Sequence, residues 1–317
     1  MDIKRILTLT IALLFVGSAF SCGARVQPAT AESIAGTSAP APSPIVMEFI
    51  TPTPTPKLTP TPTPSPEPTG RALRAWNLRT TQRTLLMKYP PADGNIEAAL
   101  NKIAIDPDKK LVALTFDDGP SNMNTNRILD VLEQYNARAT FFVIGKRIQN
   151  HEETIARAIS MGCEIGSHTW GHSDFTKYPK RILIDSLTKV DEAMKTNFGY
   201  TMTLFRPPYA SINKDVEEAA LDMGYVMVLW SGSSHDWSIQ DVDKIYKNTF
   251  HCVQDGAIVL FHDIYPVTAE AIERIVPDLV EQGYQLVTVS ELIAMDETPI
   301  EPGERYGGWA DSIKVEY

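Results

Sequence analysis

The sequence predicts an α/β protein whose strands form a closed or nearly closed parallel barrel, with an open doubly wound sheet as the alternative. From about residue 110, short apolar runs rich in β-branched and aromatic residues alternate seven times with longer segments of helical period. This alternation implies crossover connections between parallel strands. The runs are apolar on both faces, as expected for strands that are buried on both sides.

The expected strands are residues 110–116, 139–145, 163–168, 203–207, 226–231, 257–262 and 285–290. Helix candidates lie between them. Leu183, Leu187, Val190 and Met194 recur at i, i+4, i+7 and i+11, which places them on one face of a helix. We expect this stripe to face the core.

The first 22 residues are typical of a secretory signal peptide. Lys4 and Arg5 precede an apolar segment, residues 6–16, and small residues follow. "AFSC", ending at Cys22, resembles a bacterial lipobox, although Ala19 and Phe20 depart from its usual residues. A lipoprotein anchor, plain secretion and an uncleaved anchor all remain open. Each predicts an extracytoplasmic location, with membrane contact only through this N-terminal segment.

Residues 23–70 are expected to be a disordered Pro/Thr-rich linker. Eleven of the 23 prolines of the chain lie between Pro40 and Pro68. Such a composition cannot bury a core and favours polyproline II, so residues 51–69 could reach roughly 60 Å. After it we expect a lead-in at 71–109, either packed or partly mobile, a folded α/β domain at 110–295, and a loose C-terminal tail at 296–317.

Charge and cysteine content restrict the partners. The formal charge is −10, and the globular part has no basic cluster, which argues against nucleic acid and strongly anionic polymers. No feature implies a protein partner. Cys163 and Cys252 lie in apolar surroundings, and we expect two buried thiols rather than a disulfide.

Polar side chains follow five of the seven expected strands, at the point where each strand ends. They stand in "FDDG" after the first strand, "SHTWGH" at the third, "FRPPY" at the fourth, "HDW" after the fifth and "LFHD" at the sixth. The seventh offers only Ser290 and Glu291. Because the carboxyl ends of parallel barrel strands open on one rim, we expect one active site there.

Two of these residues, His168 and His172, are four positions apart, a spacing that lets two imidazoles bind one ion. The spacing alone is a weak signal. With a neighbouring carboxylate it becomes a set of two histidines and one acid that leaves positions open for water and substrate. A bound metal activates water, and a carboxylate and an imidazole can carry the protons of a hydrolysis.

"TFDDGP", "HTWGH", "RPPY", "DW" and "LFH", in this order, resemble the five motifs of the NodB-type polysaccharide deacetylases, carbohydrate esterase family four. The resemblance covers roughly residues 110 to 290. It implies a distorted (β/α)7 barrel that deacetylates an acetylated polysaccharide with one divalent metal ion. Zinc is the usual ion, with cobalt, nickel or manganese as alternatives.

The resemblance also implies roles for individual residues. Asp118, His168 and His172 would bind the metal. Asp117 would be the general base, and His262 the acid that protonates the leaving amine. Arg206 and Asp236 would hold Asp117 and His262, either respectively or through a shared network. The substrate would contact Pro208, Tyr209, Trp237 and Leu260. The backbone N–H of Tyr209 would help hold the oxyanion. Trp237 and Leu260 would form the wall of the pocket for the acetyl group.

Two positions depart from the family pattern. Ser233 stands where the family often has an aspartate, with His235 directly before Asp236, which puts a supporting hydrogen bond in doubt. Cys163 replaces a common histidine, and we interpret it as packing.

The remaining candidates have structural interpretations. We expect His151 and His251 to be solvated, Trp230 to lie in the core, and Asp263 to cap the next helix or turn. Trp170 either stacks on sugar or buttresses the two histidines.

The primary functional hypothesis is removal of N-acetyl groups from a cell-envelope or extracellular polysaccharide, with peptidoglycan N-acetylglucosamine as the favoured polymer. The alternatives are an O-acetyl esterase on acetylated xylan, a chitin-type oligosaccharide deacetylase, and a non-catalytic glycan-binding module. A glycosidase is disfavoured, because Asp117 and Asp118 are adjacent, whereas its two carboxylates stand about 5 Å or more apart across the bond.

Overall fold

The computed structural model describes residues 70–88, 94–296, 298 and 300–309. The expected signal peptide and almost all of the Pro/Thr-rich linker lie outside the described residues, so both stay predictions. Within the described ranges, no helix is both long enough and apolar enough to cross a membrane.

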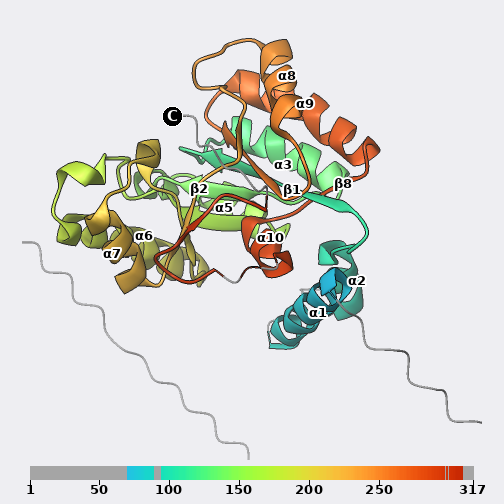
Figure 1. Ribbon diagram of the computed structural model, residues 1–317, viewed down its shortest axis with the longest axis horizontal. Coiled ribbons are helices and arrows are strands. Elements are labelled where there is room, and N and C mark those ends of the chain that lie inside the picture. The colour runs from blue at the N-terminus through green and yellow to red at the C-terminus, as the bar shows by residue number, and fades with distance from the viewer. Residues whose placement is uncertain (1–69, 89–93, 297, 299, 310–317) are drawn as a thin grey trace, which may run out of the picture. The chain divides into compact units, whose positions relative to one another are not determined.

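The strands of the described residues form a single sheet in which every paired strand runs parallel to its neighbour (Figure 1). They are β1 Lys110–Asp117, β2 Thr140–Val143, β3 Glu164–Ser167, β4 Leu204–Phe205, β5 Val226–Val228, β6 Gly232–Ser233, β7 Ala257–His262, β8 Tyr284–Leu286 and β9 Arg305–Tyr306. All seven predicted strands are present. The two-residue strands β6 and β9 were not predicted.

The strand order is β6-β7-β1-β2-β3-β4-β5-β9, and β8 pairs with the first half of β1. Just after β9, Gly308 forms an antiparallel bridge with Ala257 at the start of β7. The two ends of the sheet therefore meet through one bridge rather than a full ladder. The prediction of a nearly closed, distorted (β/α) barrel is confirmed, and the open doubly wound alternative is not.

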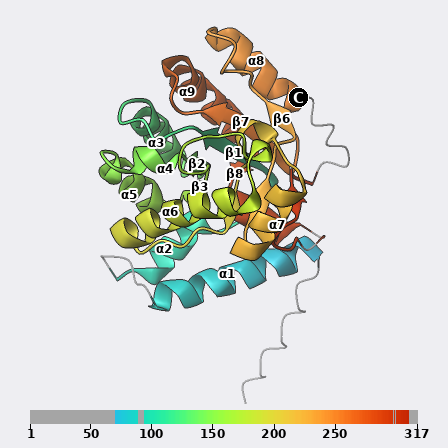
Figure 2. The ribbon, with the colours of Figure 1, turned by 90° about the vertical axis from the view of Figure 1, so that its left-hand side faces the viewer.

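Helices surround the strands, which lie in the centre of Figure 2. They are α1 Gly70–Lys88, α2 Ile96–Ile103, α3 Asn124–Gln134, α4 Gly145–Ile148, α5 Glu152–Ser160, α6 Lys180–Phe198, α7 Lys214–Met223, α8 Val242–Cys252, α9 Pro266–Glu281 and α10 Val289–Met295, with short 3-10 turns η1 Phe175–Lys177 and η2 Pro208–Ala210. The predicted stripe on α6 is buried, as expected for a core face.

Alternation along β1 separates two cores. Val112, Leu114 and Phe116 belong to the large cluster shared with the helices, whereas Leu111 and Ala113 belong to a second cluster on the opposite, inner face of the sheet. Because successive strand residues point to opposite faces, Thr115 and Asp117 continue the inner face. The strand therefore carries Asp117 to the mouth of the barrel without exposing its apolar residues.

The seventh strand is shorter than predicted. It ends at Leu286, and α10 begins at Val289 instead of the strand continuing to residue 290. The side chain of Thr288 accepts from the backbone of Glu291, and the Glu291 side chain accepts from the backbone of Thr288. This capping box starts a helix and overrides the β-forming residues around it.

Ser290 and Glu291 consequently do not reach the rim. The Ser290 backbone N–H donates to Glu164, the first residue of β3, at 3.0 Å. Glu291 pairs with Arg138, just before β2, at 3.1 Å. Both residues therefore lie at the amino ends of these strands, opposite the site.

The C-terminal tail is not loose where the structure describes it. β9 pairs with β5, and the Trp309 indole N–H donates to the Leu292 carbonyl at 3.2 Å. The prediction was wrong here because a two-residue strand gives no detectable periodicity. Residues 310–317 lie outside the described residues.

The lead-in packs on the barrel through its described residues. The Arg71 guanidinium donates to both carboxylate oxygens of Asp255, at 2.9 and 3.2 Å. Arg74 donates to the Met295 carbonyl at 2.8 Å. Of the two possibilities left open for this segment, the packed one holds for α1.

Candidate metal and active site

The residues predicted to form the site meet at the carboxyl ends of the strands, around a hollow of about 410 Å³. Its lining residues are Asp117, Asp118, His168, His172, Pro207, Tyr209, Ala210, Trp230, Ser233, His235, Trp237, Leu260, His262 and Tyr265. Strand register explains why they meet. Asp117 is level with His262 of β7, and β3 and β4 end side by side at Ser167 and Phe205.

Asp118, His168 and His172 each offer one ligand atom, and these atoms all lie within 4.8 Å of one another. Asp118 Oδ1 is 3.6 Å from His168 Nε2 and 3.3 Å from His172 Nε2. Asp118 Oδ1 is also buried and has no hydrogen-bond partner within the described part of the chain. A buried carboxylate oxygen without a partner is costly, so a cation bound among these three atoms fits the donor set.

His168 is oriented for this task by the backbone. Its Nδ1–H donates to the Arg206 carbonyl at 2.8 Å, which leaves the Nε2 lone pair facing Asp118. Burial lowers the pKa of His168 and outweighs the opposing charges of Asp117 and Asp118. Both effects favour a neutral imidazole with a fixed tautomer, the form that binds a metal.

The other two ligands depend on unusual backbone conformations. Asp118 has φ 70° and His172 has φ 57°, both in the left-handed region that residues other than glycine seldom adopt. The loop before His172 is fixed to α4, since the Gly145 N–H donates to the Thr169 carbonyl at 2.9 Å and the Lys146 N–H to the Trp170 carbonyl at 3.0 Å. Such strain persists where the surroundings hold it, and it is common at functional sites.

Asp117 has a different partner. Its Oδ1 accepts from Arg206 Nη1 at 2.8 Å, and its Oδ2 lies 3.7 Å from His168 Nε2. Arg206 is fully buried, stacks on Phe142 at 4.2 Å, and donates to Thr115 Oγ1 and the Val228 carbonyl. The guanidinium therefore has a fixed position and holds Asp117 beside the metal ligands without being one.

His262 is held by Asp236. Its Nδ1 lies 2.8 Å from Asp236 Oδ1, and its backbone N–H donates to Oδ2 at 2.6 Å. Thr268 Oγ1 donates to Asp236 Oδ2 at 2.7 Å. Burial lowers the pKa of His262, but the hydrogen bond and charge of Asp236 outweigh it and raise the pKa to about 9. His262 is therefore protonated at neutral pH, as a general acid requires.

The sequence left open whether Arg206 and Asp236 hold Asp117 and His262 separately or through a shared network. Arg206 contacts Asp117, and Asp236 contacts His262, so the two positioning residues act on separate partners. Asp236 contacts His262 and Thr268 although position 233 is a serine and not the family's usual aspartate. Ser233 Oγ instead accepts from the His235 N–H at 3.2 Å. The departure from the pattern does not cost His262 its support.

The predicted substrate residues lie around the same hollow. Leu260 is buried and Trp237 is 57% exposed, and both line it. Tyr209 is 64% exposed and has φ 60°. Pro208, beside Tyr209 in η2, is buried and is not among the residues that line the hollow.

Trp230 also lines the hollow, which the sequence interpretation as pure core missed. It packs against the inner cluster as well, and the Arg206 guanidinium lies 5.6 Å from its ring centroid. The parity of β5 could have revealed it, because residues 226, 228 and 230 share a face. Trp170 does not line the hollow; it packs against the large core and so buttresses the histidine loop.

Asp263 does not cap a helix. It is 1% exposed, accepts from Thr125 Oγ1 and faces Gly119, where an added Cβ would lie 2.2 Å from both carboxylate oxygens. Burial raises its pKa to about 7. This close approach leaves no room for a side chain at Gly119.

The remaining predictions concern residues away from the site. Cys163 is buried and Cys252 part-buried, and neither forms a disulfide. His251 is exposed as expected, whereas His151 is part-buried and its Nδ1 lies 2.7 Å from the Arg147 carbonyl oxygen.

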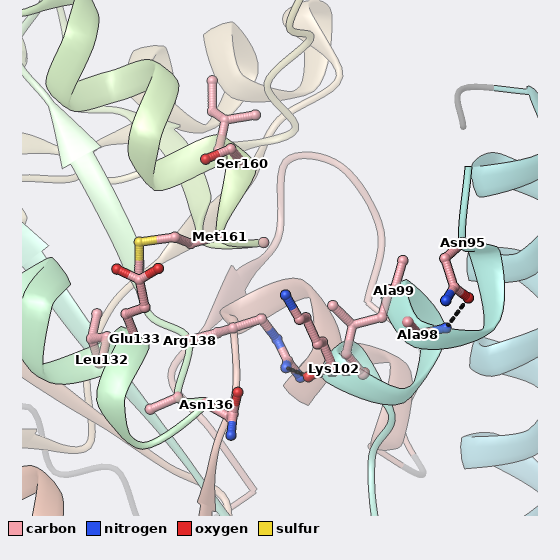
Figure 3. Close-up of a pocket in the computed structure, with 14 residues that line it drawn as sticks. Asn95, Ala98, Ala99, Lys102, Leu132, Glu133, Asn136, Arg138, Ser160 and Met161 are labelled. Atoms are coloured by element: carbon pink, nitrogen blue, oxygen red, sulfur yellow. Dashed lines mark hydrogen bonds between the residues drawn. The ribbon is translucent and has the colours of Figure 1, made fainter. Parts of the chain in front are cut away.

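A second hollow, of about 480 Å³, lies among α2, α3 and α5 (Figure 3). It is lined by Asn95, Ala98, Ala99, Lys102, Ile103, Leu132, Glu133, Asn136, Ala137, Arg138, Ile159, Ser160, Met161 and Gly162. No histidine or cysteine is among these lining residues, and the buried Arg138 is already bound by Glu291. This hollow lacks the metal-binding set found at the rim.

Fold and site together define a (β/α) barrel hydrolase scaffold with a two-histidine, one-carboxylate centre. A family model described as polysaccharide deacetylase matches residues 104–228. The peptidoglycan-N-acetylmuramic acid deacetylase PdaC of Bacillus subtilis is 39% identical over 188 residues, 59% of this chain and 40% of its own. Its solved structure has a TM-score of 0.58, with 38% identity, and covers 60% of this chain and 93% of that structure.

Two further proteins are similar to this chain. A peptidoglycan-N-acetylglucosamine deacetylase of Bacillus cereus is 38% identical over 195 residues, 58% of this chain and 89% of its own. A family 4 acetyl xylan esterase from Clostridium thermocellum, solved with a cobalt ion, has a TM-score of 0.59 and 33% identity, and covers 63% of this chain and 98% of that one. The chain belongs to the polysaccharide deacetylase family, the NodB-type enzymes of carbohydrate esterase family four. It spans about four tenths of the length of the first curated relatives it matches.

Proposed function

We propose that this protein is a metal-dependent hydrolase that removes N-acetyl groups from a cell-envelope polysaccharide, with peptidoglycan N-acetylglucosamine as the favoured substrate. One observation carries the proposal. A three-residue cation site lies in one hollow with a carboxylate fixed by Arg206 and an imidazole fixed by Asp236. The names of the relatives support the substrate class, since several are peptidoglycan deacetylases.

A divalent ion held by Asp118, His168 and His172 would lower the pKa of a bound water and polarise the acetyl carbonyl. Zinc suits two imidazoles and a carboxylate, and cobalt, nickel or manganese would suit them as well. Both histidines present Nε2 to the shared centre. The left-handed backbone at Asp118 and His172 presets the ligand positions before an ion arrives.

Asp117 would take the proton of the attacking water. Arg206 fixes one oxygen of the carboxylate and leaves Oδ2 on the side of the metal ligands. His262 would give a proton to the amide nitrogen as the C–N bond breaks, leaving a free amine and acetate. The raised pKa of His262 keeps the imidazole protonated at neutral pH, so a proton is available when the C–N bond breaks.

The substrate would be held by the remaining rim residues. Leu260 and Trp237 would form the apolar wall for the acetyl methyl, and the Tyr209 N–H would face the carbonyl oxygen as charge develops. Pro208 would act indirectly, by fixing the backbone before Tyr209. These roles rest on position and on the family pattern.

We also propose an extracytoplasmic location, either anchored through a lipid or signal anchor in residues 1–22 or freely secreted, with a spacer in 23–70. The support comes from the sequence pattern and from the peptidoglycan substrates named for the relatives. An enzyme of the cell wall needs this placement.

A second candidate function is O-acetyl esterase activity on xylan, favoured by the similarity to a family 4 acetyl xylan esterase. Ester and amide hydrolysis pass through the same kind of tetrahedral intermediate, so one site can serve both. A non-catalytic glycan-binding module is the third, and it would require loss of a ligand, the base or the acid; all of these positions are filled.

Acetate release by the full chain from peptidoglycan, chitin oligosaccharides and acetylated xylan separates these functions. We expect release from the N-acetylated substrates, with peptidoglycan the best. Release from xylan alone would establish the esterase instead. Glycan binding with no release from any substrate would leave only the binding module.

A further inference from the structure

A hollow of about 420 Å³ adjoins the reaction pocket on the side of η1. It is lined by His172, Ser173, Asp174, Lys177, Tyr178 and Tyr209, and we call it the tyrosine hollow. His172 and Tyr209 also line the reaction pocket, so the two spaces share a wall. A ligand too long for the reaction pocket would extend into this neighbour.

Two tyrosine rings flank the hollow from separate segments, and both are exposed. Tyr178 is 48% exposed and Tyr209 is 64% exposed. Each ring nevertheless packs against a second aromatic ring. Tyr178 lies against the buried Phe175, at 6.1 Å between centroids, and Tyr209 lies edge-on to His172 at 4.6 Å. A ring that is packed on one side and exposed on the other loses little conformational entropy when a ligand covers its exposed face.

The charge of the hollow is balanced. Lys177 Nζ lies 3.0 Å from Asp174 Oδ2, and Asp174 Oδ1 accepts from the Thr176 hydroxyl at 2.6 Å. An ammonium has three donors, and one carboxylate oxygen does not use them all. The hollow therefore offers hydrogen-bonding groups with no net charge, which suits a neutral hydroxylated ligand better than an anion.

We propose that the tyrosine hollow is a sugar subsite. It binds the pyranose ring next to the acetylated residue that occupies the reaction pocket, with Tyr178 covering the C–H face of the ring and Lys177 bonding a hydroxyl or carbonyl oxygen. This inference rests on the proposed function, because it takes the ligand to be a polysaccharide. It makes Tyr178 a residue that sets the preference for chain length.

The test measures kcat/KM for acetate release from N-acetylglucosamine oligosaccharides of increasing length. For Tyr178→Ala we expect a loss of about tenfold on the longest oligosaccharides and less than about twofold on the shortest substrate that is turned over. Tyr178→Phe keeps the ring and should keep most of the activity. Lys177→Ala should show a smaller, length-dependent loss.

Lys244→Ala is the matched control, since Lys244 also pairs with an aspartate three residues before it but lies at the start of α8. It should leave kcat/KM unchanged at every length. An equal loss on all lengths with Tyr178→Ala, or no loss at all, would overturn the subsite.

The affinity for oligosaccharides tests the subsite independently of the proposed function. If the unmodified protein releases no acetate, the proposed function fails, and the affinity of the same oligosaccharides is then measured by calorimetry. Weaker binding by Tyr178→Ala than by Tyr178→Phe would still support the subsite. Equal binding by the two variants, or no binding by the unmodified protein, would refute it.

Discussion

Arg206 Nη1 lies 2.8 Å from Asp117 Oδ1, whereas the neighbouring carboxylate, Asp118, faces two imidazoles and no guanidinium. Two identical side chains, adjacent in the sequence, thus have different surroundings. Strand parity explains the difference, because Asp117 continues the inner face of β1 where Arg206 is buried, and Asp118 follows with a left-handed backbone. Unlike surroundings allow one carboxylate to bind a cation and the other to move a proton.

Asp117→Asn should therefore remove the base and leave the metal site. Loss of a general base typically costs about 10²–10⁴ in rate. We expect a fall of that size in kcat for acetate release, with metal affinity within a few-fold of the unmodified protein. Asp130→Asn, an exposed aspartate on α3, is the control and should be fully active. Undiminished activity of Asp117→Asn would remove this residue from the mechanism.

His172→Ala should do the opposite and weaken metal binding directly. It removes one of three ligands, so the dissociation constant for Zn²⁺, measured by calorimetry on the metal-free protein, should rise by at least about 100-fold. Changes to residues that only hydrogen-bond a metal ligand already cost about 10–100-fold. His251→Ala changes an exposed histidine on α8 and should bind Zn²⁺ normally. Equal affinities in the two variants would place the ion elsewhere.

The alkaline side of the pH–rate profile should report His262. This residue must be protonated to act as an acid, so activity should fall as pH rises through about 9. In Asp236→Asn the charge that raises the pKa of His262 is gone while burial, which lowers it, remains. The alkaline limb should then move to lower pH, and kcat at neutral pH should fall. An unmoved limb would mean that another group causes it.

Phe116→Ala should destabilise the fold without touching the site's polar groups. Phe116 is fully buried and stacks between Phe141 and Phe261, with ring centroids 5.1 and 5.6 Å away. The free energy of unfolding, measured with urea, should fall by about 3–5 kcal/mol. Phe116→Leu should lose far less. A loss below about 1 kcal/mol for the alanine variant would show that the aromatic stack is not central to the core.

The sequence predicted the strands and the rim well because both depend on short-range patterns. Buried parallel strands are apolar runs, and the residues that follow them must meet at one edge. The capping box at Thr288 and Glu291 was also visible in the sequence, but the β-forming residues before it concealed the start of α10. That error placed Ser290 and Glu291 at the wrong end of the barrel.

Other features depend on contacts between distant segments and leave no local signal. β9 is two residues long and is defined only by its pairing with β5. Asp263, which follows β7, is buried against Gly119 and Thr125, which follow the neighbouring strand β1. The separate pairing of Arg206 with Asp117 and of Asp236 with His262 likewise required the strand register.

We propose that the cation site formed by Asp118, His168 and His172 drives hydrolysis of an acetamide. The most direct measurement is acetate release from N-acetylglucosamine oligosaccharides by the full chain, before chelation, after chelation, and after return of a stoichiometric divalent ion. We expect activity before chelation, a loss of at least about 100-fold after it, and recovery when the ion returns. Undiminished acetate release by the chelated protein, verified to be metal-free, would exclude a role of the cation in catalysis.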